Sequence, residues 1–231
     1  DGTNGTELWK SDGTNAGTMM VKNIAPGSTG LDKAPLVYYN NNVYFKGNDG
    51  SNGNELWKSD GTNGGTQLVK DIMPGINGSN PLNPTVVNGL LLFSANDGIQ
   101  GRELWKSDGT SAGTVLLKDI RSGSNSSSDP TNFTVAGNKL FFISDDGTNG
   151  RELWKSDGTA SGTLLVKDIY SGVSSSNVLA IKNINGEIYF QANDGIYGSE
   201  LWKSDGTLSG TFLVKDIYGG TGNASPSNLI N

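Results

Sequence analysis

Short apolar runs, each bounded by glycine, asparagine or aspartate, follow one another along the whole chain. In one representative stretch the runs cover 85–87, 90–95, 103–107 and 115–120. Runs rich in β-branched and aromatic residues that end at Asn-Gly or Asp-Gly are typical of strands joined by hairpins, because these turn pairs tolerate positive φ. No segment of ten or more residues has a helical period. The pattern therefore predicts an all-β protein made of antiparallel meanders.

One eight-residue string, Glu-Leu-Trp-Lys-Ser-Asp-Gly-Thr, occurs five times. Its copies begin at Glu7, Glu55, Glu103, Glu152 and Glu200, with spacings of 48, 48, 49 and 48 residues. The strand pattern recurs with the same period, and each period holds four candidate strands. Self-similarity at a fixed period is the signature of a repeat architecture. The sequence therefore predicts a single repeat array over residues 1–231.

The second run of each repeat contains three consecutive apolar residues. These triplets are Val43–Phe45, Leu91–Phe93, Leu140–Phe142 and Ile188–Phe190. A strand that is apolar at every position is buried on both faces. A four-stranded antiparallel sheet covered on both faces by copies of itself is a propeller blade, and roughly 40 to 50 residues is a usual blade length. We therefore expect a β-propeller of four-stranded antiparallel blades, with five blades as the leading count.

The phase of the repeats bears on how a ring of blades would close. The chain begins before the third strand of one blade, Glu7–Ser11, and ends with Ser227–Asn231, which aligns with a first strand. We expect a closing blade spliced from residues 1–24 and 226–231, in which the second strand is lacking. Unpaired strand edges favour pairing with another chain. This phase predicts either further residues in the native protein or self-association through the incomplete blade.

The composition argues against several kinds of chemistry. The 231 residues include no cysteine and no histidine, so a disulfide framework, a thiolate nucleophile and the commonest general base are excluded. A net charge of -6 argues against sequence-independent binding of nucleic acid, which needs a basic surface. No apolar run reaches the roughly 18 to 20 residues of a membrane-spanning helix. We expect no nucleic-acid partner and no membrane span.

The repeated string Glu-Leu-Trp-Lys-Ser-Asp-Gly-Thr resembles the motif of the ELWxxDGT-repeat proteins, a family of exported and surface proteins of bacteria. The resemblance covers essentially the whole chain. It implies a propeller-like fold and an extracellular or cell-surface location, and it implies no established reaction. The repeat number and length also resemble the five-bladed tachylectin-type lectins, although the motifs of those lectins are absent.

Charged residues that recur in every repeat are interpreted first as parts of the framework. The Ser-Asp-Gly-Thr segment is typical of an Asp turn, in which the carboxylate accepts backbone N–H groups. The turn aspartates are Asp12, Asp60, Asp108, Asp157 and Asp205. Lys10 and Lys22 are expected to pair with Glu7 across neighbouring strands. Calcium bound at clustered aspartates is the alternative, but the spacing does not match an EF-hand loop, so we expect no metal or other cofactor.

All tryptophans of the chain lie in the motif. They are Trp9, Trp57, Trp105, Trp154 and Trp202. A position in mid-strand, between leucine and lysine, predicts a wedge packed between neighbouring blades, and the alternative is a platform on which a sugar ring stacks. Carboxylates are numerous, but five equivalent copies do not single out one general acid and one base of a glycosidase. We therefore expect no enzymatic activity.

The repeats differ most in the loop that follows the fourth strand. These loops are Ala25–Lys33, Met73–Asn83, Arg121–Asp129, Tyr170–Asn177 and Tyr218–Ser225. Arg121, Tyr170 and Tyr218 are the candidate ligand-binding residues, and neutral drift of polar linkers is the alternative. We expect a non-catalytic repeat scaffold that binds a protein or glycan. The alternatives are a multivalent lectin with sites at blade interfaces and, third, a glycan-active enzyme.

Overall fold

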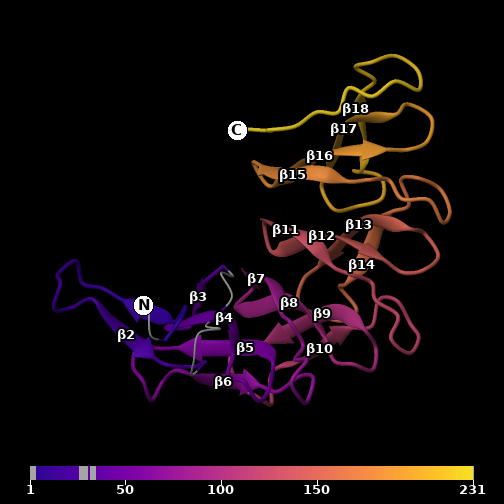
Figure 1. Ribbon diagram of the computed structural model, residues 1–231. Helices are drawn as coiled ribbons and strands as arrows, with labels where there is room; N and C mark the ends of the chain where they lie inside the picture. The colour runs from indigo at the N-terminus through magenta and orange to yellow at the C-terminus, as the bar shows by residue number, and fades with distance from the viewer. Residues whose placement is uncertain (1–3, 26–30, 32–34, 231) are drawn as a thin grey trace. The chain divides into compact units, whose positions relative to one another are not determined.

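The computed structural model describes residues 4–25, 31 and 35–230. These residues form strands, turns and loops, and none of them is in a helix (Figure 1). The described part of the chain thus holds no helix that could cross a membrane. The prediction of an all-β protein is confirmed.

The strands are grouped in five sheets, one for each copy of the motif. The two-stranded sheet consists of β1 (Leu8–Lys10) and β2 (Met19–Lys22). The next sheet consists of β3 (Val37–Tyr39), β4 (Asn42–Asn48), β5 (Asn54–Ser59) and β6 (Gln67–Lys70). It is followed by β7 (Leu82–Val87), β8 (Leu90–Asn96), β9 (Arg102–Ser107) and β10 (Val115–Lys118). The last two sheets consist of β11 (Thr131–Ala136), β12 (Lys139–Asp145), β13 (Arg151–Ser156) and β14 (Leu164–Lys167), and of β15 (Leu179–Ile184), β16 (Glu187–Asn193), β17 (Ser199–Ser204) and β18 (Phe212–Lys215).

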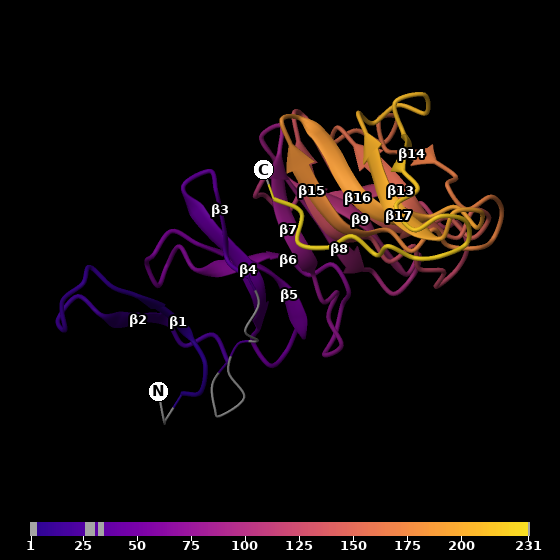
Figure 2. The same cartoon turned by 90° about the horizontal axis from the view of Figure 1, so that it is seen from above.

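Every four-stranded sheet is a meander, because its strands neighbour one another in chain order. The last sheet shows this in both views, where β15, β16 and β17 lie side by side (Figure 1, Figure 2). The register also repeats, since Phe45 lies opposite Trp57 and Phe190 lies opposite Trp202. These sheets are the blades that the sequence pattern predicts.

The strand bounds of the β7–β10 sheet differ from the prediction by one residue at the end of β8 and at the start of β9, and by more at two other points. The first strand of the β7–β10 sheet begins at Leu82 rather than at Thr85, and its register shifts between these two residues. Asn83, within the shift, has a φ of 54°, a left-handed conformation that asparagine tolerates better than most residues. The fourth strand ends at Lys118, because the N–H of Ile120 leaves the ladder and donates to the Glu103 carboxylate at 2.8 Å.

The chain divides into two compact units that are built from the same repeat. The first unit comprises Asp1–Gly101 and Trp105–Leu116, and the second comprises Arg102–Leu104 and Leu117–Asn231. The boundary passes through β9. Each unit has its own apolar core.

Motif tryptophans are central to both cores. In the first unit Trp105 packs with Phe93 of its own sheet and with Leu56 of the preceding sheet. In the second unit Trp202 packs in the same way with Phe190 and with Leu153. Each of these tryptophans therefore fills the space between two neighbouring sheets, as a wedge would.

Burial of the tryptophans follows from this packing. Trp57, Trp105 and Trp154 are each 6% exposed and Trp202 is 5% exposed, whereas Trp9 is 44% exposed. Among the described residues no sheet precedes the one that carries Trp9, so the apolar partners that the other tryptophans meet are not there. The exposure of a motif tryptophan thus depends on the preceding sheet and not on its own strand.

The apolar triplets are buried on both faces in the two middle sheets. In β8 the side chains of Leu91–Phe93 are fully buried, and Leu140–Phe142 of β12 are at most 2% exposed. In the outer two four-stranded sheets one member of each triplet, Val43 or Tyr189, is half-buried. Burial on two faces, which the consecutive apolar residues predict, therefore requires a sheet on each side.

Lys10 and Lys22 bind backbone carbonyls and not Glu7, which corrects their prediction, whereas Lys203 of the last motif pairs with Glu187 at 3.2 Å. Lys10 Nζ donates to the carbonyl of Gly61 at 2.9 Å, and Lys22 Nζ donates to that of Thr66 at 2.7 Å. The equivalent bonds in the other repeats are Lys58 to Gly109 (2.8 Å), Lys70 to Thr114 (2.8 Å), Lys118 to Thr163 (2.6 Å), Lys155 to Gly206 (2.6 Å) and Lys167 to Thr211 (2.8 Å). Each of these seven lysines therefore ties its sheet to the next one through a backbone carbonyl.

The expected closing blade lies partly outside the described residues, because residues 1–3, 231 and most of the loop Ala25–Lys33 are not described. Residues 226–230 form no strand. Even so, Ser225 and Asn228 have φ values of 48° and 53°, which match Asn177 (51°) and Ala180 (53°) at the start of β15. The backbone of this segment repeats the kink of a first strand. The splicing of a closing blade stays a prediction.

Candidate functional site

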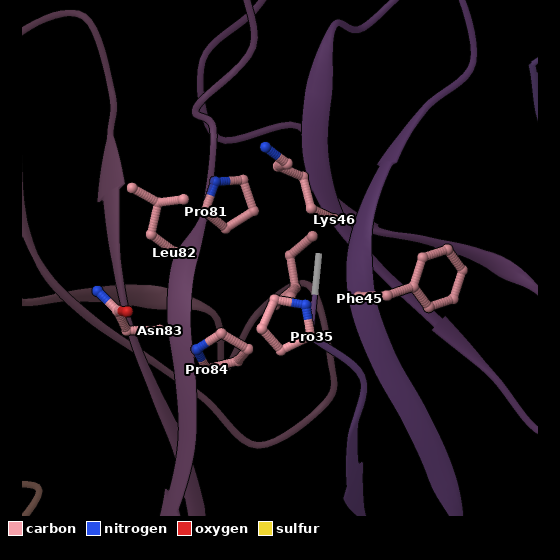
Figure 3. A pocket seen from close by; sticks show the side chains of 8 residues that line it. Pro35, Phe45, Lys46, Pro81, Leu82, Asn83 and Pro84 are labelled. Atoms are coloured by element: carbon pink, nitrogen blue, oxygen red, sulfur yellow. The ribbon is translucent and has the colours of Figure 1, made fainter. Parts of the chain in front are cut away.

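Two pockets lie at the same place in the repeat, one in each unit. Each is formed by the start of a first strand and by the second and third strands of the preceding sheet. In the first unit the lining residues are Pro35, Phe45, Lys46, Leu56, Pro81, Leu82, Asn83 and Pro84 (Figure 3). In the second unit they are Thr131, Asn132, Ile143, Arg151, Asn177, Val178 and Leu179. We call these the first-unit pocket and the second-unit pocket.

The backbone that enters each first strand has an unusual conformation. Two residues three positions apart are left-handed although neither is glycine. The pairs are Asn80 and Asn83, Asp129 and Asn132, and Asn177 and Ala180. Asparagine and aspartate are enriched in this region of φ, and sparsely populated backbone conformations cluster at functional sites. The recurring Asn and Asp of these loops were the sequence signal for the pocket entrance, and the sequence analysis missed it.

The first-unit pocket is small and apolar. Its volume is about 100 Å³, and the rings of Pro35, Pro81 and Pro84 gather around it (Figure 3). Its one cationic side chain is already engaged, since Lys46 Nζ donates to Asn80 Oδ1 at 3.0 Å. Pockets that hold drug-sized ligands are typically about 300 to 1,000 Å³, so this recess suits no more than a small apolar group.

The second-unit pocket is larger and polar. Its volume is about 350 Å³. Arg151 Nη2 donates to the carbonyl of Asp129 at 3.1 Å and to Thr131 Oγ1 at 2.9 Å, so the guanidinium is held in place. Asn132 and Asn177 add amide groups, and Ile143 with its neighbours adds an apolar wall. A pocket with convergent polar groups on an apolar surface is what small-molecule sites share.

A third pocket, of about 230 Å³, lies in the first unit beside β1. It is lined by the two exposed aromatic side chains Trp9 and Tyr38, which are 44% and 68% exposed. Lys10 also lines it, but its ammonium is bonded to Gly61. This pocket offers stacking surfaces and few free charges.

The three predicted ligand-binding residues do not line these pockets. Arg121 Nη1 pairs with Asp145 Oδ2 at 2.8 Å, and a Cβ at Gly147 would lie only 3.3 Å from its Nε. Tyr170 covers the next sheet in the same way, since a Cβ at Gly195 would lie 2.7 Å from its Cζ. These side chains lie over glycines with φ near 80°, which leave room for a covering group.

Tyr218, the third predicted residue, has no glycine of a following sheet beneath it in the described part of the chain and is 65% exposed. Met73, which the sequence analysis did not single out, takes the covering position over Gly98. The first residue of the loop is therefore a cover for the next Asp-Gly turn. Ligand binding by Arg121, Tyr170 and Tyr218 stays a prediction.

The motif aspartates form turns. Asp108 Oδ1 accepts the N–H of Thr110 at 2.8 Å and its Oγ1–H at 2.7 Å, and these bonds lower the pKa of the carboxyl. Asp12, Asp60, Asp157 and Asp205 accept the same pair of bonds from the threonine two positions on. The Asp turn expected from the sequence is therefore present in every copy. Within the described ranges no cluster of three or more Asp or Glu side chains is placed to hold a metal ion.

The motif glutamates are buried and bind the loop that leaves their own sheet. Glu103 accepts hydrogen bonds from the N–H of Ile120 at 2.8 Å and from the N–H and Oγ of Ser128 at 2.9 and 2.6 Å. Glu7, Glu55, Glu152 and Glu200 accept from the equivalent loop in their repeats. Burial raises the pKa of Glu103 and Glu152 to about 7, against the hydrogen bonds that favour the ionised form. The side chains of Glu103 and Glu152 are fully buried.

No protein-family model matches the chain, and no curated protein matches it either. Among solved structures, a prolyl endopeptidase is similar with a TM-score of 0.54 and 13% identity, over 91% of this chain and 30% of that one. A puromycin hydrolase is similar with a TM-score of 0.53 and 14% identity, over 90% of this chain and 34% of that one. The chain spans about a third of the length of these proteins. The likeness concerns the fold, and together with the meander sheets it shows a β-propeller architecture. Membership in the ELWxxDGT-repeat family stays a prediction.

Proposed function

We propose that this protein is a non-catalytic repeat scaffold that binds a protein or glycan ligand at a cell surface or outside the cell. The observation that carries the proposal is a division of labour between positions of the repeat. Charged residues of the repeated motif bind backbone groups, and residues that differ between repeats, such as Lys46 and Ile143, are among those that line the pockets.

The constant charged residues support the non-catalytic part of the proposal. Glutamates such as Glu152 are buried among N–H donors, and aspartates such as Asp157 hold turns. Lysines such as Lys155 bind turn carbonyls of the next sheet. A general acid or base must reach the reacting atoms, and these groups are occupied by the fold.

The variable residues support the binding part. At the second-strand position of the pocket, Lys46 in the first unit corresponds to Ile143 in the second. At the entry to the first strand of the following sheet, Pro81 corresponds to Val178, whereas Leu82 corresponds to Leu179 and is unchanged. A scaffold presents different binding surfaces by placing different side chains on the same backbone.

A lectin-like function is the second candidate. It is favoured by the place of the two pockets, each between neighbouring sheets, which is where a multivalent lectin with one site per blade interface would bind. Asparagine amides and threonine hydroxyls are suitable hydrogen-bond partners for sugar hydroxyls.

The two functions can be tested together on arrays of glycans and of peptides, with calcium and with a chelator. Binding to a glycan or peptide that saturates and leaves the ligand intact by mass spectrometry supports the scaffold. Saturable glycan binding with more than one site per chain favours the lectin. Cleavage of a bound ligand, or the absence of binding on both arrays, would contradict the proposal.

A further inference from the structure

Two arginines occupy the same position of consecutive repeats. Arg102 and Arg151 each precede the motif glutamate, and each donates its backbone N–H to a loop serine at 2.9 Å. The loop residue that follows the second serine is Asp129 in one repeat and Asn177 in the next, both left-handed with φ of 47° and 51°. The two positions thus have the same backbone and differ by one negative charge.

Asp129 supplies a negative charge that acts on Arg102. Burial lowers the pKa of Arg102, and the charge of Asp129 opposes that shift by stabilising the cation. At the second arginine the corresponding Asn177 offers only a neutral amide. Arg151 therefore lacks the counter-charge that its predecessor has.

The carboxylate opposite Arg151 in its own sheet already has partners. Asp145 lies opposite Arg151 in the register of β12 and β13, but its Oδ2 accepts from Arg121 Nη1 at 2.8 Å. Its Oδ1 accepts the N–H of Gly147 at 2.7 Å. The Asp145 carboxylate is therefore paired with Arg121, and none of the described residues that line the second-unit pocket is acidic.

We propose that the second-unit pocket binds a sugar acid, free or at the end of a saccharide, whose carboxylate pairs with Arg151. An arginine and a carboxylate form charge-assisted hydrogen bonds, about twice as strong as neutral ones. Thr131, Asn132 and Asn177 supply donors and acceptors for hydroxyl groups, and Val178 with Leu179 supplies an apolar surface for the ring carbons. The volume of about 350 Å³ accommodates one such residue.

This inference rests on the proposal that the pockets between repeats bind small ligands, and it adds the charge of the ligand. The test is calorimetric titration of the whole chain with glucuronate and with glucose, which share the ring and differ in the carboxylate. We expect saturable binding of glucuronate below about 10 mM, and binding of glucose at least about tenfold weaker. A disaccharide that ends in glucuronate distinguishes a terminal residue from the free acid, because only a site open to a chain accepts both.

The matched variants exchange the residue that differs between the two repeats. Asn177→Asp restores the counter-charge found at Asp129, and we expect it to weaken glucuronate binding at least about tenfold while leaving the melting temperature near that of the parent. Asn80→Asp makes the same charge change at the equivalent position of the first unit and should leave binding unchanged. Arg151→Asn, which copies Asn54 of another repeat, should abolish the preference for the acid.

Three results would overturn the proposal. Absence of glucuronate binding in this range rejects the sugar acid, and binding of a neutral sugar with the same affinity rejects the carboxylate while leaving the pocket as a binding site. If Asn177→Asp and Asn80→Asp weaken glucuronate binding equally, the effect comes from the net charge of the chain and not from this pocket. In each of these cases, binding of another ligand by the chain would still support the scaffold proposal.

Discussion

The first-unit pocket and the second-unit pocket are built on the same backbone, and yet they differ in size and in chemistry. The first has about 100 Å³ closed in by proline rings, and its lysine is bound by Asn80. The second has about 350 Å³ and an arginine whose loop partner is neutral. The comparison shows that the repeat can alter a pocket without altering the sheets around it.

This freedom has a structural basis. The motif glutamate, lysines and tryptophan hold neighbouring sheets and their loops together through contacts that recur in most of the repeats. Exposed lining residues such as Leu82 and Leu179 lie outside the apolar cores, whereas Val178 belongs to one. Changes to the framework should therefore reduce stability, and changes to exposed residues of the pocket should affect binding alone.

The largest effect is expected at a buried wedge. Trp105→Ala should lower the free energy of unfolding by about 3 to 5 kcal/mol, because it removes a large aromatic side chain from between two sheets. Trp9→Ala is the matched control in the same motif, and its exposed side chain should cost about 1 kcal/mol or less. Urea unfolding measures both. Equal losses would show that the preceding sheet does not matter.

The buried glutamates should make stability depend on pH. Burial raises the pKa of Glu103 and Glu152 from 4.5 to about 7, so the folded state binds protons that the unfolded state has released. Their contribution is complete below pH 4.5 and is lost as the pH rises to about 7, by at most about 1.4 kcal/mol per pH unit for each group.

Thermal melts between pH 4.5 and 7 check this direction, and Glu152→Gln should flatten the slope because the amide does not titrate. The motif aspartates have lowered pKa values and lose their contribution only at more acidic pH, so they do not disturb this window. Stability that rises across the window would contradict the burial of the glutamates.

A lysine that ties two sheets should matter less than a tryptophan and more than a surface lysine. Lys70→Met leaves the carbonyl of Thr114 without its charged donor and should cost about 1.5 to 3 kcal/mol. Lys182→Met is the control on an exposed part of β15 and should change stability by less than about 0.5 kcal/mol. Chemical denaturation of the two variants side by side decides whether the bond between sheets stabilises the fold.

The smallest effect is expected in the pocket. Leu82→Thr changes a lining residue of the first-unit pocket that is 38% exposed, and it should change stability by no more than about 0.5 kcal/mol. A loss comparable to that of Lys70→Met would place the pocket residues in the framework and break the distinction drawn from the two pockets.

The sequence by itself was enough to determine the period, the strands and the turns. Each depends on residues close together in the chain: the Asp108 turn closes within two residues, and the apolar triplet Leu91–Phe93 marks a strand without any long-range information. The Ser-Asp-Gly-Thr turn is readable because its donor and acceptor are both local. For the same reason the all-β class and the blade follow from one repeat.

The tertiary structure alone decided which partners distant residues find. Lys58 and Gly109 are 51 residues apart, and Lys70 and Thr114 are 44 apart, so no local pattern shows that the lysines bind carbonyls rather than glutamate. Arg121 and Tyr170 are covers for the next turn, and the pockets combine residues of two sheets. Hydrogen bonds and burial between repeats depend on how neighbouring sheets pack, and that packing is a property of the folded chain.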